Sequence, residues 1–147
     1  LADDCFDVFM LGYNLLNPSA AKTILPQCEK QGVGTLCMYA VRNALSIPER
    51  LRANIEQILS SGQADPALLH PDEDLSFLLE NGAADSVTEA AYRFCSHTPG
   101  LHVILTGTGS ADHLRANAAA ISAPSLPAAS LDRLRAMFGN VDCISGN

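Results

Sequence analysis

The chain of 147 residues has the length of one domain, and a hydrophobic content of 48% is enough to build a sizeable core. Its formal net charge is −7, with nine basic residues against sixteen acidic ones, so it lacks the basic stripe that neutralises nucleic-acid phosphates. We therefore expect no nucleic-acid partner and no anionic membrane surface as a partner. The apolar runs are far shorter than a membrane span, and none follows a basic segment as in a targeting signal.

Cysteine usage indicates free thiols. An odd number of cysteines, without a CxxC pair or a Cys/His cluster, argues against both a disulfide framework and a zinc site. The five are Cys5, Cys28, Cys37, Cys95 and Cys143. We expect no metal and a reducing, cytoplasmic location. The chain begins at Leu1 without an initiator methionine, directly before a strand-like run, which suggests a fragment or a processed product.

The first part of the chain predicts a strand, a helix and a second strand. Residues 7–13 form an apolar run rich in β-forming side chains, which is typical of a strand buried on both faces. A helix is expected to open at residues 18–19 and to end at Gly32, with Pro26 either bending it or delaying its start. Residues 33–38 form the next apolar run, so the spacing is that of a βαβ unit.

A polar insertion of about residues 43–85 follows this strand. Residues 46–49 have the pattern of a capping box with proline in the first turn, which predicts a helix over residues 48–59. Residues 61–72 are loop-like, and apolar residues between 75 and 79 predict one short helix.

The last part of the chain predicts a helix, a third strand and two more helices. A second capping box at residues 86–89 opens a helix with a clear apolar stripe, and residues 101–106 form the strand. Helices are then expected over residues 110–121 and, after a cap at Ser130, over residues 131–138. The first of these should turn four side chains inward: Ala111, Leu114, Ala118 and Ile121.

Strands that alternate with helices predict an α/β fold with a parallel sheet. A three-stranded sheet that is apolar on both faces has two unpaired edges and little cover, so it is more naturally a piece of a larger sheet or barrel. We expect residues upstream of Leu1, or another chain, to complete it.

A strand, turn and helix at residues 102–117 form the most informative motif. Gly107 and Gly109 would let the backbone adopt positive φ and approach a ligand, and Ser110 can cap the following helix, whose positive end then faces the turn. An ordinary strand-to-helix turn fits the same pattern. No GxSxG, HExxH or GxxxxGK[ST] pattern is present, and we assign no catalytic residue to this chain.

Three motifs in order resemble the C-terminal part of the aldo-keto reductase family, NAD(P)H-dependent (β/α)8 barrels of the TIM type. They are GYNLLN, CEKQGVGTLCMYAVR and VILTGTGSADHLRANAAAI, which begin at Gly12, Cys28 and Val103. The resemblance implies that residues 1–147 hold barrel strands six to eight with the C-terminal helices. It also implies that the intact protein reduces aldehydes or ketones, with its catalytic tetrad on earlier strands.

The resemblance further implies part of a site for NADP(H) or NAD(H), in the loops after the last two strands. By this resemblance Met38 packs on the nicotinamide ring, and Ala40, Val41 and Arg42 begin the loop that passes the pyrophosphate. The remaining positions are Gly107, Thr108 and Gly109 at the adenosine-phosphate end, His113 where arginine or histidine is common, and Asn117 where an asparagine contacts adenine.

Three departures from the family pattern leave alternatives open. Met10 stands where a glutamine often binds the carboxamide, Gly109 where a basic residue often meets the 2′-phosphate, and Ala116 where an acid is frequent. The preference between NADP and NAD therefore stays open. So does a different class of function, in which the chain is part of a non-catalytic nucleotide-binding or regulatory module, or a structural piece that several chains complete.

Overall fold

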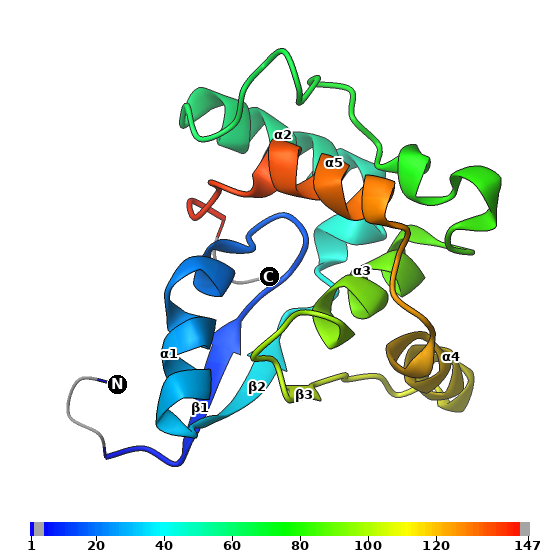
Figure 1. Ribbon diagram of the computed structural model, residues 1–147. Coiled ribbons are helices and arrows are strands. Elements are labelled where there is room, and N and C mark those ends of the chain that lie inside the picture. Colours follow the sequence, from blue (N-terminus) through cyan, green and yellow to red (C-terminus); the bar gives the residue numbers. More distant parts are fainter. Residues whose placement is uncertain (2–4, 145–147) are drawn as a thin grey trace.

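The computed structural model describes residues 1 and 5–144, which include a parallel sheet in the order β1-β2-β3 (Figure 1). The strands are β1 (Val8–Gly12), β2 (Gly34–Met38) and β3 (Val103–Ile104). Val8 pairs with Gly34, and Leu36 pairs with Val103. The prediction of an α/β fold with a parallel sheet is confirmed, although β3 is shorter than expected.

Helix α1 (Ile24–Gln31) connects β1 and β2 and starts later than residues 18–19. A separate 3-10 turn, Ser19–Lys22, precedes it, and Pro26 lies in the first turn of α1, where a missing backbone N–H breaks no helical hydrogen bond. The delayed start is thus the correct alternative. Gly32 ends the helix as predicted, with φ 69°.

The sheet is covered on one face and open on the other, so the prediction of strands buried on both faces is wrong. In and after β1, Leu11 and Tyr13 are buried, whereas Met10, directly before Leu11, is 49% exposed. Val8 and Val103 are exposed as well. Burial on the second face needs a partner surface, which the described residues do not provide.

Four elements lie between the end of β2 and the helix that begins at Val87. They are η2 (Asn43–Leu45), α2 (Pro48–Ser60), η3 (Ser76–Leu78) and η4 (Glu80–Gly82). Helix α2 begins at Pro48 as predicted, but the expected capping box does not form. Its N-cap is Ile47, and the Ser46 hydroxyl donates to the Asn43 carbonyl at 3.2 Å.

Helix α3 (Val87–Ser96) begins as its capping box predicts. Ser86 Oγ accepts a hydrogen bond from the Glu89 N–H at 3.1 Å, and the Glu89 carboxylate accepts one from the Asp85 N–H at 3.0 Å. Two otherwise unpaired donors are thereby satisfied.

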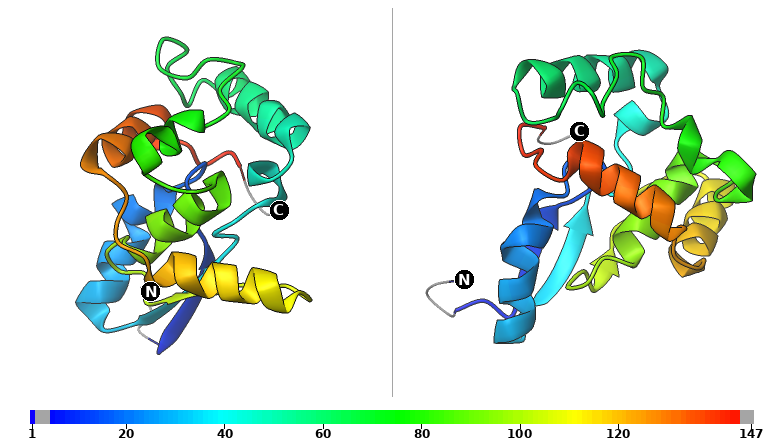
Figure 2. Two further views of the ribbon diagram at one scale, coloured as in Figure 1. Left: turned by 90° about the vertical axis from the view of Figure 1, so that its right-hand side faces the viewer. Right: turned by 45° about the horizontal axis from the view of Figure 1, so that its top comes forward.

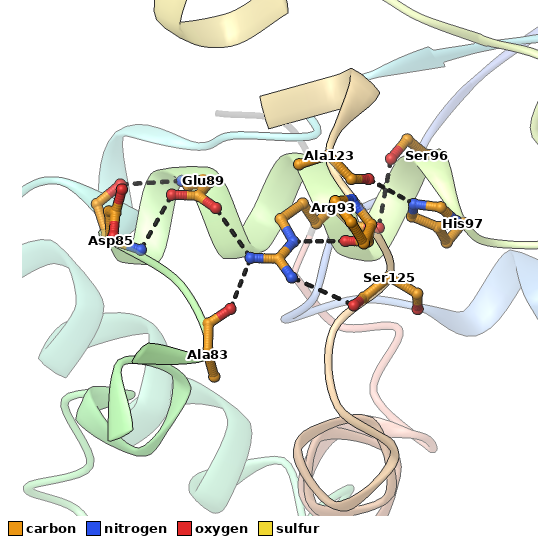
Figure 3. A network of polar contacts seen from close by, with 10 residues as sticks. Ala83, Asp85, Glu89, Arg93, Ser96, His97, Ala123 and Ser125 are labelled. Atoms are coloured by element: carbon orange, nitrogen blue, oxygen red, sulfur yellow. Dashed lines mark hydrogen bonds and ion pairs between the residues drawn. The ribbon is translucent and has the colours of Figure 1, made fainter. Parts of the chain in front are cut away.

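Arg93 of α3 ties three segments together (Figure 3). Its Nη1 donates to the Ala83 carbonyl at 2.6 Å and to Glu89 Oε1 at 2.9 Å. Nε donates to the Pro124 carbonyl at 2.7 Å, and Nη2 to the Ser125 carbonyl at 3.2 Å. One side chain thus joins the end of the 43–85 segment, α3 and the connection between the last two helices.

The last two helices, α4 (Ala111–Ser122) and α5 (Ala128–Phe138), differ from the prediction in packing and in start. Helix α4 packs against α3 (Figure 2), and its Ala120 is buried, whereas Leu114 is 52% exposed and Ala111 and Ala118 are exposed. The predicted inward stripe is confirmed only at Ile121, which is half-buried against the core, and is wrong at the other three positions, because no described element covers that side. Helix α5 begins before Ser130, which is buried within it and caps nothing.

Helix α5 completes the core. Leu134, Met137 and Phe138 are buried in the same cluster as Ile55 and Ile58 of α2. All five cysteines are free thiols, as predicted. None of the helices in the described part of the chain is long and apolar enough to cross a membrane.

Candidate functional site

The loops that follow β2 and β3 leave the same edge of the sheet. The strands are parallel neighbours, and the Leu105 N–H donates to the Cys37 carbonyl at 3.0 Å just past β3. The Tyr13 N–H likewise donates to the Met38 carbonyl at 3.1 Å past β1. Ligands of parallel α/β sheets and barrels bind at this carboxyl-terminal edge. The structure thus brings the two predicted loops together.

The first loop carries Met38, Ala40 and Val41 in unequal environments. Met38 and Val41 are half-buried, whereas Ala40 is 1% exposed, so Ala40 offers almost no surface to a ligand. Tyr39 between them has φ 60°, and its ring lies close to Gly12, 3.5 Å from where a Cβ would stand. A non-glycine residue with such a φ stores strain, and this strain collects at binding sites.

Arg42 is the most unusual residue of this loop. Arg42 is only 5% exposed, and its buried Nε has no hydrogen-bond partner. No carboxylate among the described residues forms an ion pair with it. Burial lowers the pKa of Arg42, and the neighbouring Tyr39 phenol partly opposes this effect. A buried guanidinium lacking a counter-charge is well suited to receive an anion.

The second loop, with Gly107, Thr108 and Gly109, is exposed. Neither glycine has positive φ, so that prediction is wrong, and an added Cβ at either position would meet nothing within 4 Å. Ser110 does cap α4, because its Oγ accepts from the His113 N–H at 3.3 Å. The turn therefore offers open space and a helix N-terminus, without a conformation that requires glycine.

His113 and Asn117 project from α4 beyond this loop. The His113 side chain is exposed. Asn117 Nδ2 donates to Thr106 Oγ1 at 2.6 Å, and Thr106 Oγ1 lies 2.8 Å from the Tyr92 hydroxyl. This chain of contacts fixes the amide so that its nitrogen is used internally. No described residue donates to Asn117 Oδ1, which remains available to a donor.

Sequence reasoning missed Tyr39, Thr106 and Tyr92. An aromatic residue directly after a strand is a signal that could have identified Tyr39. Thr106 and Tyr92 carried no comparable signal, because their contact depends on how α3 lies beside the loop.

Comparison with known proteins agrees with this architecture. The model of the aldo/keto reductase family matches residues 5–138. Two solved structures of aldo-keto reductase AKR11C1 from Bacillus halodurans are similar in fold at 21% sequence identity. The apo form gives a TM-score of 0.58 and the holo form 0.60. No curated protein matches the sequence.

These two likenesses cover 88% and 87% of this chain and 42% and 41% of the solved chains. The chain thus spans about two fifths of the length of the solved structures. Its parallel strands and alternating helices are part of a (β/α)8 barrel, as the motifs implied. The family match extends over most of the sequence, and the chain belongs to the aldo/keto reductase family.

Proposed function

We propose that this chain is the cofactor-holding part of an NAD(P)H-dependent oxidoreductase that reduces aldehydes or ketones. Family membership supports the reaction class, and the buried, unpartnered Nε of Arg42 is the observation that carries the cofactor site. Arg42 lies in the loop past β2, at the edge of the sheet where parallel barrels bind their ligands.

The described residues fit a dinucleotide in charge and in space. The Arg42 guanidinium would donate to a pyrophosphate oxygen, which gives its Nε the missing acceptor. Gly107, Thr108 and Gly109 would leave room for the adenosine phosphate, and the helix N-terminus capped by Ser110 favours its negative charge. A bound nicotinamide cofactor supplies the hydride, and the part of this chain is to hold and orient it.

The other implied residues would contact the two ends of the cofactor. Met38, next to Tyr39 with its strained backbone, would present an apolar surface to the nicotinamide, and Val41 would continue this surface, while Ala40 is too buried to meet the cofactor. Asn117 Oδ1 would accept a hydrogen bond from the adenine amino group, because the amide nitrogen is already engaged by Thr106.

The proposed site has no strong candidate for the cation that would bind the 2′-phosphate of NADP(H). Arg115 already pairs with Asp112 at 2.8 Å, and Gly109 brings no charge, so His113 is the basic group closest in sequence to the turn. We propose NADP(H) or NAD(H) as the cofactor, to be distinguished by the relative affinities of the two.

The groups that transfer a proton to the carbonyl, and most of the substrate pocket, are proposed to lie on the rest of the barrel, carried by the same polypeptide or by another chain. The open apolar face of the sheet, with Val8, Met10 and Val103, supports this completion. The free thiols agree with a reducing cytoplasm as the location.

The 147-residue chain, with its mass confirmed, should bind NADPH or NADH and should not oxidise either in the presence of benzaldehyde. Coenzyme fluorescence measures the binding and coenzyme absorbance the turnover. Turnover by this chain would overturn the assignment of the catalytic groups to the rest of the barrel. Absence of binding to both coenzymes would overturn the cofactor site itself.

A further inference from the structure

A cavity lies away from the loops that follow β2 and β3. Its volume is about 410 Å³, within the range of small-molecule sites. It is bounded by the turn before α1, the C-terminal end of α3 and the C-terminal end of α5. Neither Arg42 nor the Gly107–Gly109 turn lines it. Any ligand of this cavity would therefore be separate from the proposed cofactor.

The cavity carries positive charge in a chain whose net charge is −7. Lys22, His97 and Arg135 line it, and none of its lining residues is an aspartate or glutamate. Lys22 Nζ donates to the neutral side chain of Asn140, so its charge is not compensated there.

Of the two other basic residues, Arg135 keeps donor capacity toward the cavity. Arg135 pairs through Nη1 with Asp132 at 2.9 Å, which occupies only part of its guanidinium. His97 Nε2 lies 2.8 Å from the Ala123 carbonyl (Figure 3), so that contact brings no negative charge. The balance at this rim therefore favours an anionic ligand.

Part of the cavity lining is apolar, although Tyr13 is only 2% and Phe94 only 7% exposed. The rings of Tyr13 and Phe94 stack with centroids 5.7 Å apart and an interplanar angle of 6°, and Leu131 and Pro18 extend the surface. The Tyr13 hydroxyl lies 3.3 Å from Thr98 Oγ1. Burial raises the pKa of Tyr13 to about 12, so this part of the lining carries no negative charge at neutral pH.

We propose that this cavity binds a small aromatic carboxylate, with the carboxylate between Lys22 and Arg135 and the ring against the apolar lining of Tyr13, Phe94 and Leu131. Both the charge of the rim and the apolar lining support this ligand class. The basic rim selects an anion, and the apolar lining selects a flat body over a hydrated inorganic ion. The proposal is independent of cofactor binding at the other site.

Three probes of matched shape test the proposal on the full 147-residue chain: benzoate, benzyl alcohol and benzylamine. Two-dimensional ¹⁵N NMR follows the backbone amides near the cavity. Benzoate should produce saturable shifts centred on Lys22, His97 and Asn140, and it should bind about tenfold more tightly than benzyl alcohol, the size expected of a charge-assisted contact. Benzylamine should bind more weakly still, because its charge is repelled.

Substitution at the rim supplies the control. Lys22→Gln and Arg135→Gln should each weaken benzoate about three- to tenfold, as expected for partly exposed charges. Lys30→Gln removes the same charge from an exposed position on α1 outside the cavity and should change the affinity less than twofold.

Equal binding of benzoate and benzyl alcohol, or equal affinities of the Lys22→Gln and Lys30→Gln variants, would overturn the proposal. Both lysines are exposed, so these two variants decide the question even if Arg135→Gln does not fold.

Discussion

Arg93 and Arg42 represent two opposite uses of a buried or half-buried arginine. Arg93 donates hydrogen bonds to three backbone carbonyls and one carboxylate, all within the chain. Arg42 has an Nε with no acceptor at all. The first therefore serves stability, whereas the second is the residue that we propose for ligand recognition.

Arg93→Met should lower the free energy of unfolding by about 2–4 kcal/mol, because several carbonyl oxygens lose a charged donor at once. Urea unfolding measures the change. Arg52→Met, at an exposed position on α2, is the matched control and should stay within about 0.5 kcal/mol of the wild type. Equal effects of the two substitutions would contradict the role of Arg93 as a link between segments.

Tyr13 makes stability depend on pH in the alkaline range. Burial raises its pKa from the usual 10.0 to about 12 in the folded chain, so the unfolded state loses its proton first as the pH rises. The stabilisation is fully present below pH 10 and is lost between pH 10 and 12, by about 2 kcal/mol. Unfolding curves over this range should fall less steeply for Tyr13→Phe. Parallel curves for both proteins would exclude the effect.

At the scale of elements, local signals were predictable and distant partners were not. Gly32 and Ser86 satisfy groups three or four residues away, so the sequence alone is enough to assign them. Ser46 has the same pattern as Ser86, yet its hydroxyl bonds backwards to Asn43. The apolar stripe predicted on α4 is also wrong at Leu114, because burial of this side chain needs a surface that no described element supplies.

Ser86→Ala should therefore cost about 1 kcal/mol of unfolding free energy through the loss of a cap. Ser46→Ala should change it by less than about 0.5 kcal/mol, since its one bond is exposed. Thermal and urea unfolding measure the free energies of unfolding of the two variants. A larger loss for Ser46→Ala would mean that the first capping box forms after all.

Substitution of a leucine by alanine should lower the free energy of unfolding much more on α5 than on α4. Leu134 on α5 is 1% exposed, and Leu134→Ala should cost about 2–5 kcal/mol. Leu114→Ala on α4 should cost less than about 1 kcal/mol in this chain, because little apolar contact is lost. If Leu114→Ala were as destabilising as Leu134→Ala, α4 would have to pack against a surface absent from the described residues.

For the whole molecule, the parallel α/β architecture and the family followed from strand spacing and three motifs, and both are confirmed. The sequence indicated that the sheet has little cover, but not which of its residues lie open. Met10 and Val103 look like core residues in a linear sequence, and only the arrangement of the helices reveals that they lack cover. The motif alone predicted Arg42 for the proposed cofactor loop, but its missing hydrogen-bond partner required the structure.

The most direct test of this account is a fluorescence titration of NADPH and NADH with the wild-type chain, Arg42→Met and Arg52→Met. We predict saturable binding that Arg42→Met weakens about 10- to 100-fold, through loss of a charge-assisted contact to phosphate, and that Arg52→Met leaves unchanged. Arg42→Met should melt no lower than the wild type, because it removes an unpaired buried donor. No saturable binding, or the same affinity for all three proteins, would contradict the cofactor site.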